Sequence, residues 1–262
     1  MLILFFFIII GAVVGSFLNV CIHRLPRNES VVWPASHCPA CGKQLSPWEL
    51  FPIISYLILK GKCSGCREPI SIRYPLVETL SAFFFVATWQ FVSGDMIYFL
   101  FYLVFVLGLL VIVFIDLEHL LIPDVVSISG IVFGLLFAGF RSGEAGSLAL
   151  LGESVFGGAL GFLFFLVVAK LGGMWFKKEV VGEGDLYLAA FMGVYLGPVG
   201  MVVALFVAYL SAALVAIVLL LGKKVKMDNY IPFGPALAFG GVISLFFCQA
   251  ILNWYFAAWV IQ

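Results

Sequence analysis

Charged residues are scarce in this chain: 11% of its 262 residues are Asp, Glu, Lys or Arg, whereas 64% are hydrophobic. Soluble globular proteins are about 25% charged and about 45–50% apolar, so the composition excludes an ordinary soluble domain. The formal net charge is zero and no basic run is present, so nothing favours nucleic acid as a partner. The composition predicts an all-α polytopic membrane protein whose surrounding partner is the lipid bilayer.

The first apolar run lacks the positive start of a secretory signal peptide. Met1–Ile22 has no basic residue in front of it, and His23 and Arg24 follow the run instead. Secretory signals begin with positive charge, and about 20 apolar helical residues cross a bilayer. We therefore expect residues 1–22 to be an uncleaved first transmembrane helix with its N-terminus outside the cytoplasm.

Three domains are expected from the change in polarity along the chain. Residues 23–74 are polar, contain several prolines and hold four of the six cysteines, which indicates a small extramembrane domain between the first two helices. Residues 75–262 are expected to form a seven-helix membrane domain. Its spans are placed at 75–92, 96–115, 125–140, 148–171, 233–252 and, as two helices, within 186–221.

The apolar run 186–221 is too long for one span, and Gly197-Pro198 is its natural break. Proline cannot continue helical hydrogen bonding, and glycine commonly ends helices. The sequence therefore predicts about eight transmembrane helices in total.

The distribution of Lys and Arg supports this count, because basic residues gather in cytoplasmic loops. With the N-terminus outside, loops 23–74, 116–124, 172–185 and 222–230 face the cytoplasm. Thirteen of the 14 basic residues fall in or beside these loops, and Arg141 is the exception. The thirteen are Arg24, Arg27, Lys43, Lys60, Lys62, Arg67, Arg73, Lys170, Lys177, Lys178, Lys223, Lys224 and Lys226.

Four cysteines form two C-x-x-C pairs with 21 residues between them, Cys38 with Cys41 and Cys63 with Cys66. Paired thiolates at this spacing are typical of a tetrahedral zinc site, and four protein ligands make such a site structural. Two disulfides or free thiols are the alternatives, and the reducing cytosol argues against disulfides. His37 is interpreted as a neighbouring surface residue rather than a ligand.

Two aspartates lie at the ends of apolar runs, Asp116 after one and Asp185 before another. The topology places both at the cytoplasmic face, where they can share one site. Charges at membrane depth cost about 2.5–3.5 kcal/mol on insertion scales, so they usually pair or face a protected cavity. Two close carboxylates share a proton, one acting as general base on water and the other as general acid.

Helix capping is the alternative for these acids. Aspartate is a favoured N-cap, which suits Asp124 before the fourth span and is also open to Asp185. Asp116 fits this alternative poorly, because an acid at a helix C-terminus opposes the helix dipole.

Five motifs together resemble the type IV prepilin peptidases along nearly the whole chain. They are Gly15–Val20 with His23–Pro26; the cysteine pairs with Ile72–Pro75 and Glu78; Asp116–Glu118 with Ile122–Asp124; Gly182–Asp185; and Ile231–Pro235.

This resemblance implies an intramembrane aspartyl endopeptidase of the bacterial inner membrane, with Asp116 and Asp185 as the catalytic pair and a periplasmic N-terminus. The implied substrates are type IV prepilins and type II secretion pseudopilins, whose leader peptide is cleaved at the cytoplasmic membrane face. The family then N-methylates the new N-terminal residue with S-adenosylmethionine. No residue can be assigned to that cofactor. The chain departs from the family at Tyr187, where lysine is frequent.

Two competing functions remain open from the residues alone. A transporter or proton-coupled channel also places acids in membrane helices, although transport sites tend to lie near the bilayer midplane. A structural membrane protein with a zinc clip would use the aspartates only to cap helices.

Overall fold

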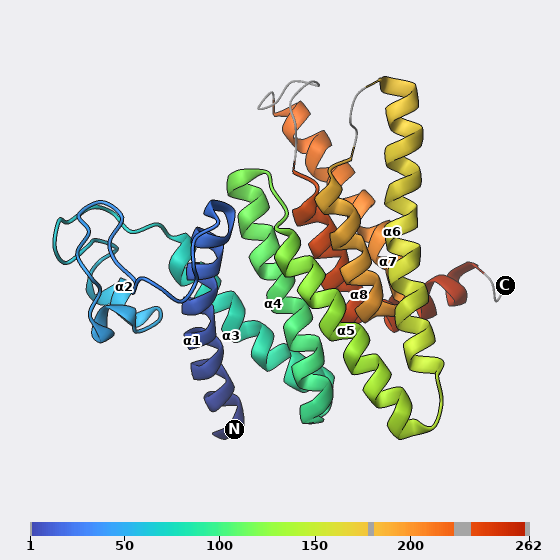
Figure 1. The fold of residues 1–262 in the computed structure, drawn as a ribbon, viewed down its shortest axis with the longest axis horizontal. Helices are drawn as coiled ribbons and strands as arrows, with labels where there is room; N and C mark the ends of the chain where they lie inside the picture. Colours follow the sequence, from blue (N-terminus) through green and yellow to red (C-terminus); the bar gives the residue numbers. More distant parts are fainter. Residues whose placement is uncertain (1, 178–180, 223–231, 260–262) are drawn as a thin grey trace. The chain divides into compact units, whose positions relative to one another are not determined.

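The computed structural model describes residues 2–177, 181–222 and 232–259, and the regular elements of these residues are helices, with no strand among them (Figure 1). The all-α fold class is therefore confirmed. The helices are α1 Leu2–Arg24, η1 Leu25–Arg27, η2 Pro47–Leu50, α2 Ile54–Ile58, α3 Arg73–Phe91, α4 Met96–His119, α5 Asp124–Ala145, α6 Ala149–Phe176, α7 Glu183–Leu221 and α8 Gly234–Trp259. Lys178, Lys223, Lys224, Lys226 and Ile231, which were named above, lie outside the described residues.

Six of the described helices are long and apolar enough to cross a membrane, namely α1, α4, α5, α6, α7 and α8. Helix α7 has 39 residues and is broken at Gly197, whose φ of 66° and ψ of 178° are not helical, with Pro198 next in the chain. The predicted break is thus confirmed, and α7 contains two of the expected spans. Helix α3 occupies the place of the second expected span without being one of the six, so the total of eight stays a prediction.

The chain folds as two compact units, residues 1–111 and residues 112–262. Helix α4 contributes its residues 96–111 to the first unit and 112–119 to the second. The first unit contains the four paired cysteines, and the second contains both candidate catalytic aspartates. The division into domains at residues 22 and 74 stays a prediction.

Within the first unit, α1 and α3 pack closely as antiparallel helices. A methyl group on Gly11 would lie 2.6 Å from the Cα atom of Ala82, and one on Gly15 would lie 2.6 Å from the Cα atom of Glu78. Small residues allow membrane helices to approach this closely. The two contacts fix the register of the pair, with Glu78 directly beside Gly15.

Within the second unit, glycines of α6 hold both halves of α7. A methyl group on Gly193 would lie 2.0 Å from the carbonyl oxygen of Gly157, and one on Gly161 would lie 2.3 Å from that of Ala189. The same position on Gly161 is also 3.0 Å from Met201, beyond the break. These close contacts fix the first half of α7, at whose start Asp185 lies.

Candidate metal centre and active site

The two cysteine pairs form loops of the same geometry, 25 positions apart. The N–H of Cys38 donates to the carbonyl of Lys43 at 2.9 Å, and the N–H of Cys63 donates to that of Glu68 at 2.9 Å. The flanking residues repeat this symmetry as isolated β-bridges, His37 with Gln44 and Lys62 with Pro69. The sequence thus encodes the same cysteine loop twice, once for each half of the four-cysteine cluster.

The four sulfur atoms of Cys38, Cys41, Cys63 and Cys66 lie within 4.8 Å of one another. Those of Cys38 and Cys66 are 3.9 Å apart, far beyond the roughly 2.05 Å of a disulfide. Four thiolates at about 2.3 Å from a tetrahedral zinc ion lie about 3.8 Å apart. The cluster therefore fits a four-coordinate metal ion, whereas the disulfide alternative does not fit.

Backbone amides prepare Cys63 for metal binding. The N–H groups of Cys66 and Gly65 point at its sulfur, and they lower the pKa of the Cys63 thiol to about 6. The Gly65 nitrogen lies 3.4 Å from that sulfur. Because the thiolate is the metal-binding form of cysteine, these amides favour the ligand over the free thiol.

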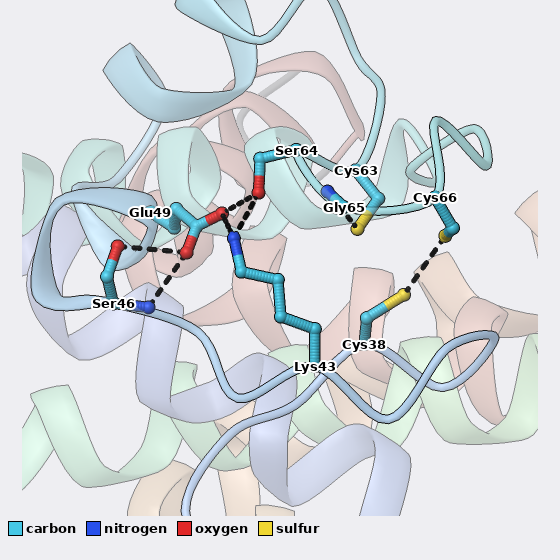
Figure 2. A network of polar contacts seen from close by, with 8 residues as sticks. All are labelled: Cys38, Lys43, Ser46, Glu49, Cys63, Ser64, Gly65 and Cys66. Atoms are coloured by element: carbon cyan, nitrogen blue, oxygen red, sulfur yellow. Dashed lines mark hydrogen bonds and ion pairs between the residues drawn. The ribbon is translucent and has the colours of Figure 1, made fainter.

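A polar network joins the two cysteine loops to η2 (Figure 2). Lys43 of the first loop forms an ion pair of 2.9 Å with Glu49, and both contact the hydroxyl of Ser64 in the second loop. Glu49 also accepts bonds from the amide and hydroxyl of Ser46, at 2.8 and 2.9 Å. With Ser64 contributing most, these bonds lower the pKa of Glu49 to about 2. Sequence reasoning missed Glu49, although Ser46-x-x-Glu49 is a capping-box pattern.

Asp116 lies in the last turn of α4 and is 4% exposed. Its Oδ2 atom accepts a hydrogen bond of 3.0 Å from the N–H of Gly234, the first residue of α8. A methyl group on Gly234 would lie 2.6 Å from that oxygen. Glycine at this position therefore allows α8 to begin against the carboxylate. Sequence reasoning missed this partner, although the Ile231–Pro235 motif contained it.

Asp185 lies in the first turn of α7 and is 6% exposed. Its Oδ2 atom accepts a bond of 3.3 Å from the N–H of Gly182, just before the helix. The N-cap is Gly182, and Asp185 is the third residue of the helix. Asp185 therefore accepts the amide of the N-cap residue, as in a capping box, and is not itself the N-cap. A methyl group on the neighbouring Gly184 would lie 2.7 Å from Cβ of Ile122. Close packing against Ile122 is thus a reason for glycine there that the sequence did not reveal.

The second unit brings Asp116 and Asp185 together, near enough for their charges to interact. The hydroxyl of Tyr209, from the other half of α7, is also within reach of the charge on Asp185. Asp124 is exposed and is the first residue of α5, while Pro123 is the N-cap. The N-cap interpretation of Asp124 is therefore wrong by one residue, and its charge instead favours the positive end of the helix dipole.

Tyr187 packs its ring near that of Phe162 on α6, with 6.2 Å between the centroids. At this position, where lysine is frequent in the family, the chain therefore uses an aromatic contact between α6 and α7.

Two family models match the chain. Residues 9–91 match the Bacterial Peptidase A24 N-terminal domain, and residues 103–217 match the Type IV leader peptidase family. No solved structure matches.

Several relatives named prepilin leader peptidase/N-methyltransferase align with most of the chain. The Pseudomonas aeruginosa protein is 34% identical over 95% of this chain and 91% of its own length. The Legionella pneumophila protein is 32% identical over 98% and 96%, and the Myxococcus xanthus protein is 37% identical over 82% and 63%. Identity at this level over nearly full length places the chain in the type IV leader peptidase family.

Proposed function

We propose that this protein is an intramembrane aspartyl endopeptidase that removes the leader peptide of type IV prepilins, with Asp116 and Asp185 as its catalytic pair. The observation that supports the pair most is its arrangement: two buried carboxylates from distant parts of the chain, each held by one backbone N–H. The names of the relatives favour this function over a transporter or a structural membrane protein.

The proposed reaction follows from two carboxyl groups that hold one proton between them. The hydrogen bonds from Gly234 and Gly182 orient the two side chains through Oδ2. The ionised aspartate takes a proton from water, and the water oxygen attacks the scissile carbonyl carbon. The protonated aspartate donates its proton to the carbonyl oxygen, which gives a tetrahedral diol. As the C–N bond breaks, the aspartate that took the proton from water passes it to the leaving amine, and the other aspartate takes a proton from a diol hydroxyl, so the pair returns to its starting state.

Further properties are proposed from the names of the relatives, from the family resemblance of the sequence motifs and from the charge distribution. We infer that the protein also cleaves type II secretion pseudopilins and N-methylates the new N-terminal residue with S-adenosylmethionine, to which no residue is assigned. The ion in the four-cysteine centre is proposed to be zinc with a structural role, because the centre has no open position for substrate. We propose that the protein lies in the bacterial inner membrane, as the family resemblance implies, and that its N-terminus is in the periplasm, as the Lys and Arg distribution predicts.

Mass spectrometry of a prepilin co-expressed with this protein tests the proposal. The expected product lacks its leader, begins after a glycine and carries a methyl group on the new N-terminal nitrogen. Full-length prepilin in cells that insert the protein correctly would contradict the peptidase function. A cleaved but unmethylated product would contradict the methyltransferase function alone.

A further inference from the structure

An apolar segment of the cysteine-containing region is exposed in a way that an extramembrane domain rarely tolerates. Residues 47–58, which comprise η2, α2 and the turn between them, are called the elbow here. Trp48 is 78% exposed and Leu57 is 67% exposed, and Trp48 stacks on Phe51 with ring centroids 5.9 Å apart. The other large apolar side chains exposed on the elbow are Leu50, Phe51, Ile54 and Ile58. Soluble surfaces seldom gather so many apolar side chains unless they contact a partner.

The elbow is attached partway along the pair of helices α1 and α3 rather than beyond its end. The N–H of Ile53 donates a 2.7 Å hydrogen bond to Glu78 of α3, and Glu78 lies beside Gly15 of α1. At 1.5 Å per residue, Gly15 is about 13 Å from the end of α1 at Arg24, and Glu78 is about 7 Å from the start of α3 at Arg73. Figure 1 agrees, since α2 lies level with the middle of α1.

Two polar groups of the elbow, the carboxylate of Glu49 and the N–H of Ile53, have protein partners. Glu49 bonds to Lys43 and Ser64 of the cysteine loops (Figure 2). The amide of Ile53 donates a hydrogen bond to the buried carboxylate of Glu78. Irregular backbone is tolerated at membrane depth only where its polar groups have protein partners.

The turn at Ile53 depends on that anchor. Ile53 has φ of 61° and ψ of −50°, a conformation that is rare for a β-branched residue. Such strain persists only where surrounding contacts enforce it, and the bond to Glu78 is one of these contacts. Glu78 therefore acts as a positioning residue that holds the elbow against α3.

We propose that the elbow is an interfacial anchor, inserted into the boundary between lipid headgroups and acyl chains beside α1 and α3. Interfacial elements bury their apolar face about 5–10 Å deep, which agrees with the depth of Glu78 below Arg73. The exposed side chains Val13 and Phe17 of α1 flank the level of Gly15, so α1 also presents apolar side chains at the depth where the elbow is attached. Lys60 and Lys62 follow the elbow directly and suit anionic headgroups.

Tryptophan quenching in full-length protein reconstituted into lipid vesicles tests this proposal, with bromine on the acyl chains as one quencher and aqueous iodide as the other. Trp33 is the matched control, because it is 76% exposed like Trp48. Arg24 at the end of α1 bonds to the carbonyls of Ser30 and Pro34, at 2.8 and 2.7 Å, and this keeps the Trp33 loop near the helix end.

Trp48→Phe is expected to remove the part of the tryptophan fluorescence that brominated acyl chains quench. Trp33→Phe is expected to remove the part that aqueous iodide quenches. If Trp48→Phe instead loses iodide-quenched emission, or both variants lose the same component, the elbow is not an interfacial anchor.

A photo-crosslink provides a second readout that does not require substitution of Trp48. With p-benzoylphenylalanine in place of Leu57, illumination in the same vesicles is expected to give mainly lipid adducts. Adducts mainly with the chain itself, or with added prepilin, would show that position 57 contacts protein rather than lipid, and would overturn the proposal. Neither readout depends on cleavage, so failure here leaves the peptidase proposal standing.

Discussion

The cysteine centre and the acid pair differ in how far along the chain their parts lie. All four cysteines proposed to bind the metal fall within residues 38–66, and each loop closes through its own backbone hydrogen bonds. Asp116 and Asp185 are 69 positions apart, and Asp116 is held by an amide 118 residues away. The proposed metal centre is thus formed by residues that lie close together in the sequence, and a short sequence pattern predicts it. The acid pair, in contrast, forms only when α4, α7 and α8 are packed.

Removal of metal ligands should have the largest effect. Cys38→Ser combined with Cys63→Ser takes one thiolate from each loop, and structural zinc contributes about 10–16 kcal/mol of apparent binding free energy in small zinc domains. Metal analysis of purified protein should find about one zinc per wild-type chain and almost none in the double variant. Cys21→Ser and Cys248→Ser, in α1 and α8, should leave the zinc in place. A fully stable, metal-free wild-type protein would contradict the structural role.

Asp116→Asn and Asp185→Asn should each abolish prepilin cleavage, with a rate loss on the order of 10³-fold or more, because general acid–base catalysis contributes about 10²–10⁴-fold. Leader release is measured on gels and by mass spectrometry, with expression and membrane insertion as controls. Asp124→Asn is the matched control. It changes an exposed acid of the same unit and should keep cleavage near the wild-type rate. Cleavage retained in either of the first two variants removes that residue from catalysis.

Gly234→Ala should reduce cleavage by about 10- to 100-fold, the equivalent of about 1.4–2.8 kcal/mol. The added methyl group would lie 2.6 Å from Oδ2 of Asp116 and would displace the carboxylate or the start of α8. Gly139→Ala in α5 is the control, since nothing lies within 4 Å of its added methyl group. Alanine should be neutral or slightly stabilising there. Equal activities of the two variants would show that the Gly234 contact does not position Asp116.

The smallest expected effect compares the two cysteine loops with each other. Gly42 and Arg67 occupy equivalent positions, with φ of 70° and 64°. Left-handed backbone costs a residue with a side chain about 1–2 kcal/mol relative to glycine. Gly42→Ala should therefore lower the unfolding temperature of the zinc-loaded protein, and Arg67→Gly should raise it or leave it unchanged. Changes in the opposite directions would show that the loops are not energetically equivalent.

Sequence reasoning found what is encoded locally. The four cysteines, the helix break at Gly197 and the helical membrane fold each depend on a short pattern or on composition. The bond from Gly234 to Asp116 was missed, as were the contact of Gly184 with Ile122 and the bond from Ile53 to Glu78. Each of these joins segments whose proximity depends on helix packing, and no periodicity within one segment encodes it. The glycines were visible as motif members, but the side chains they contact were not.

The central claim is that Asp116 and Asp185 act as one unit, and a double-mutant comparison tests it most directly. Initial rates of leader release from purified prepilin are measured in lipid for Asp116→Asn, Asp185→Asn and the double variant. Residues that act as a unit are strongly non-additive, so the double variant should retain the same residual rate as either single variant. Rate losses that multiply in the double variant, or a single variant with the wild-type rate, would contradict a shared site.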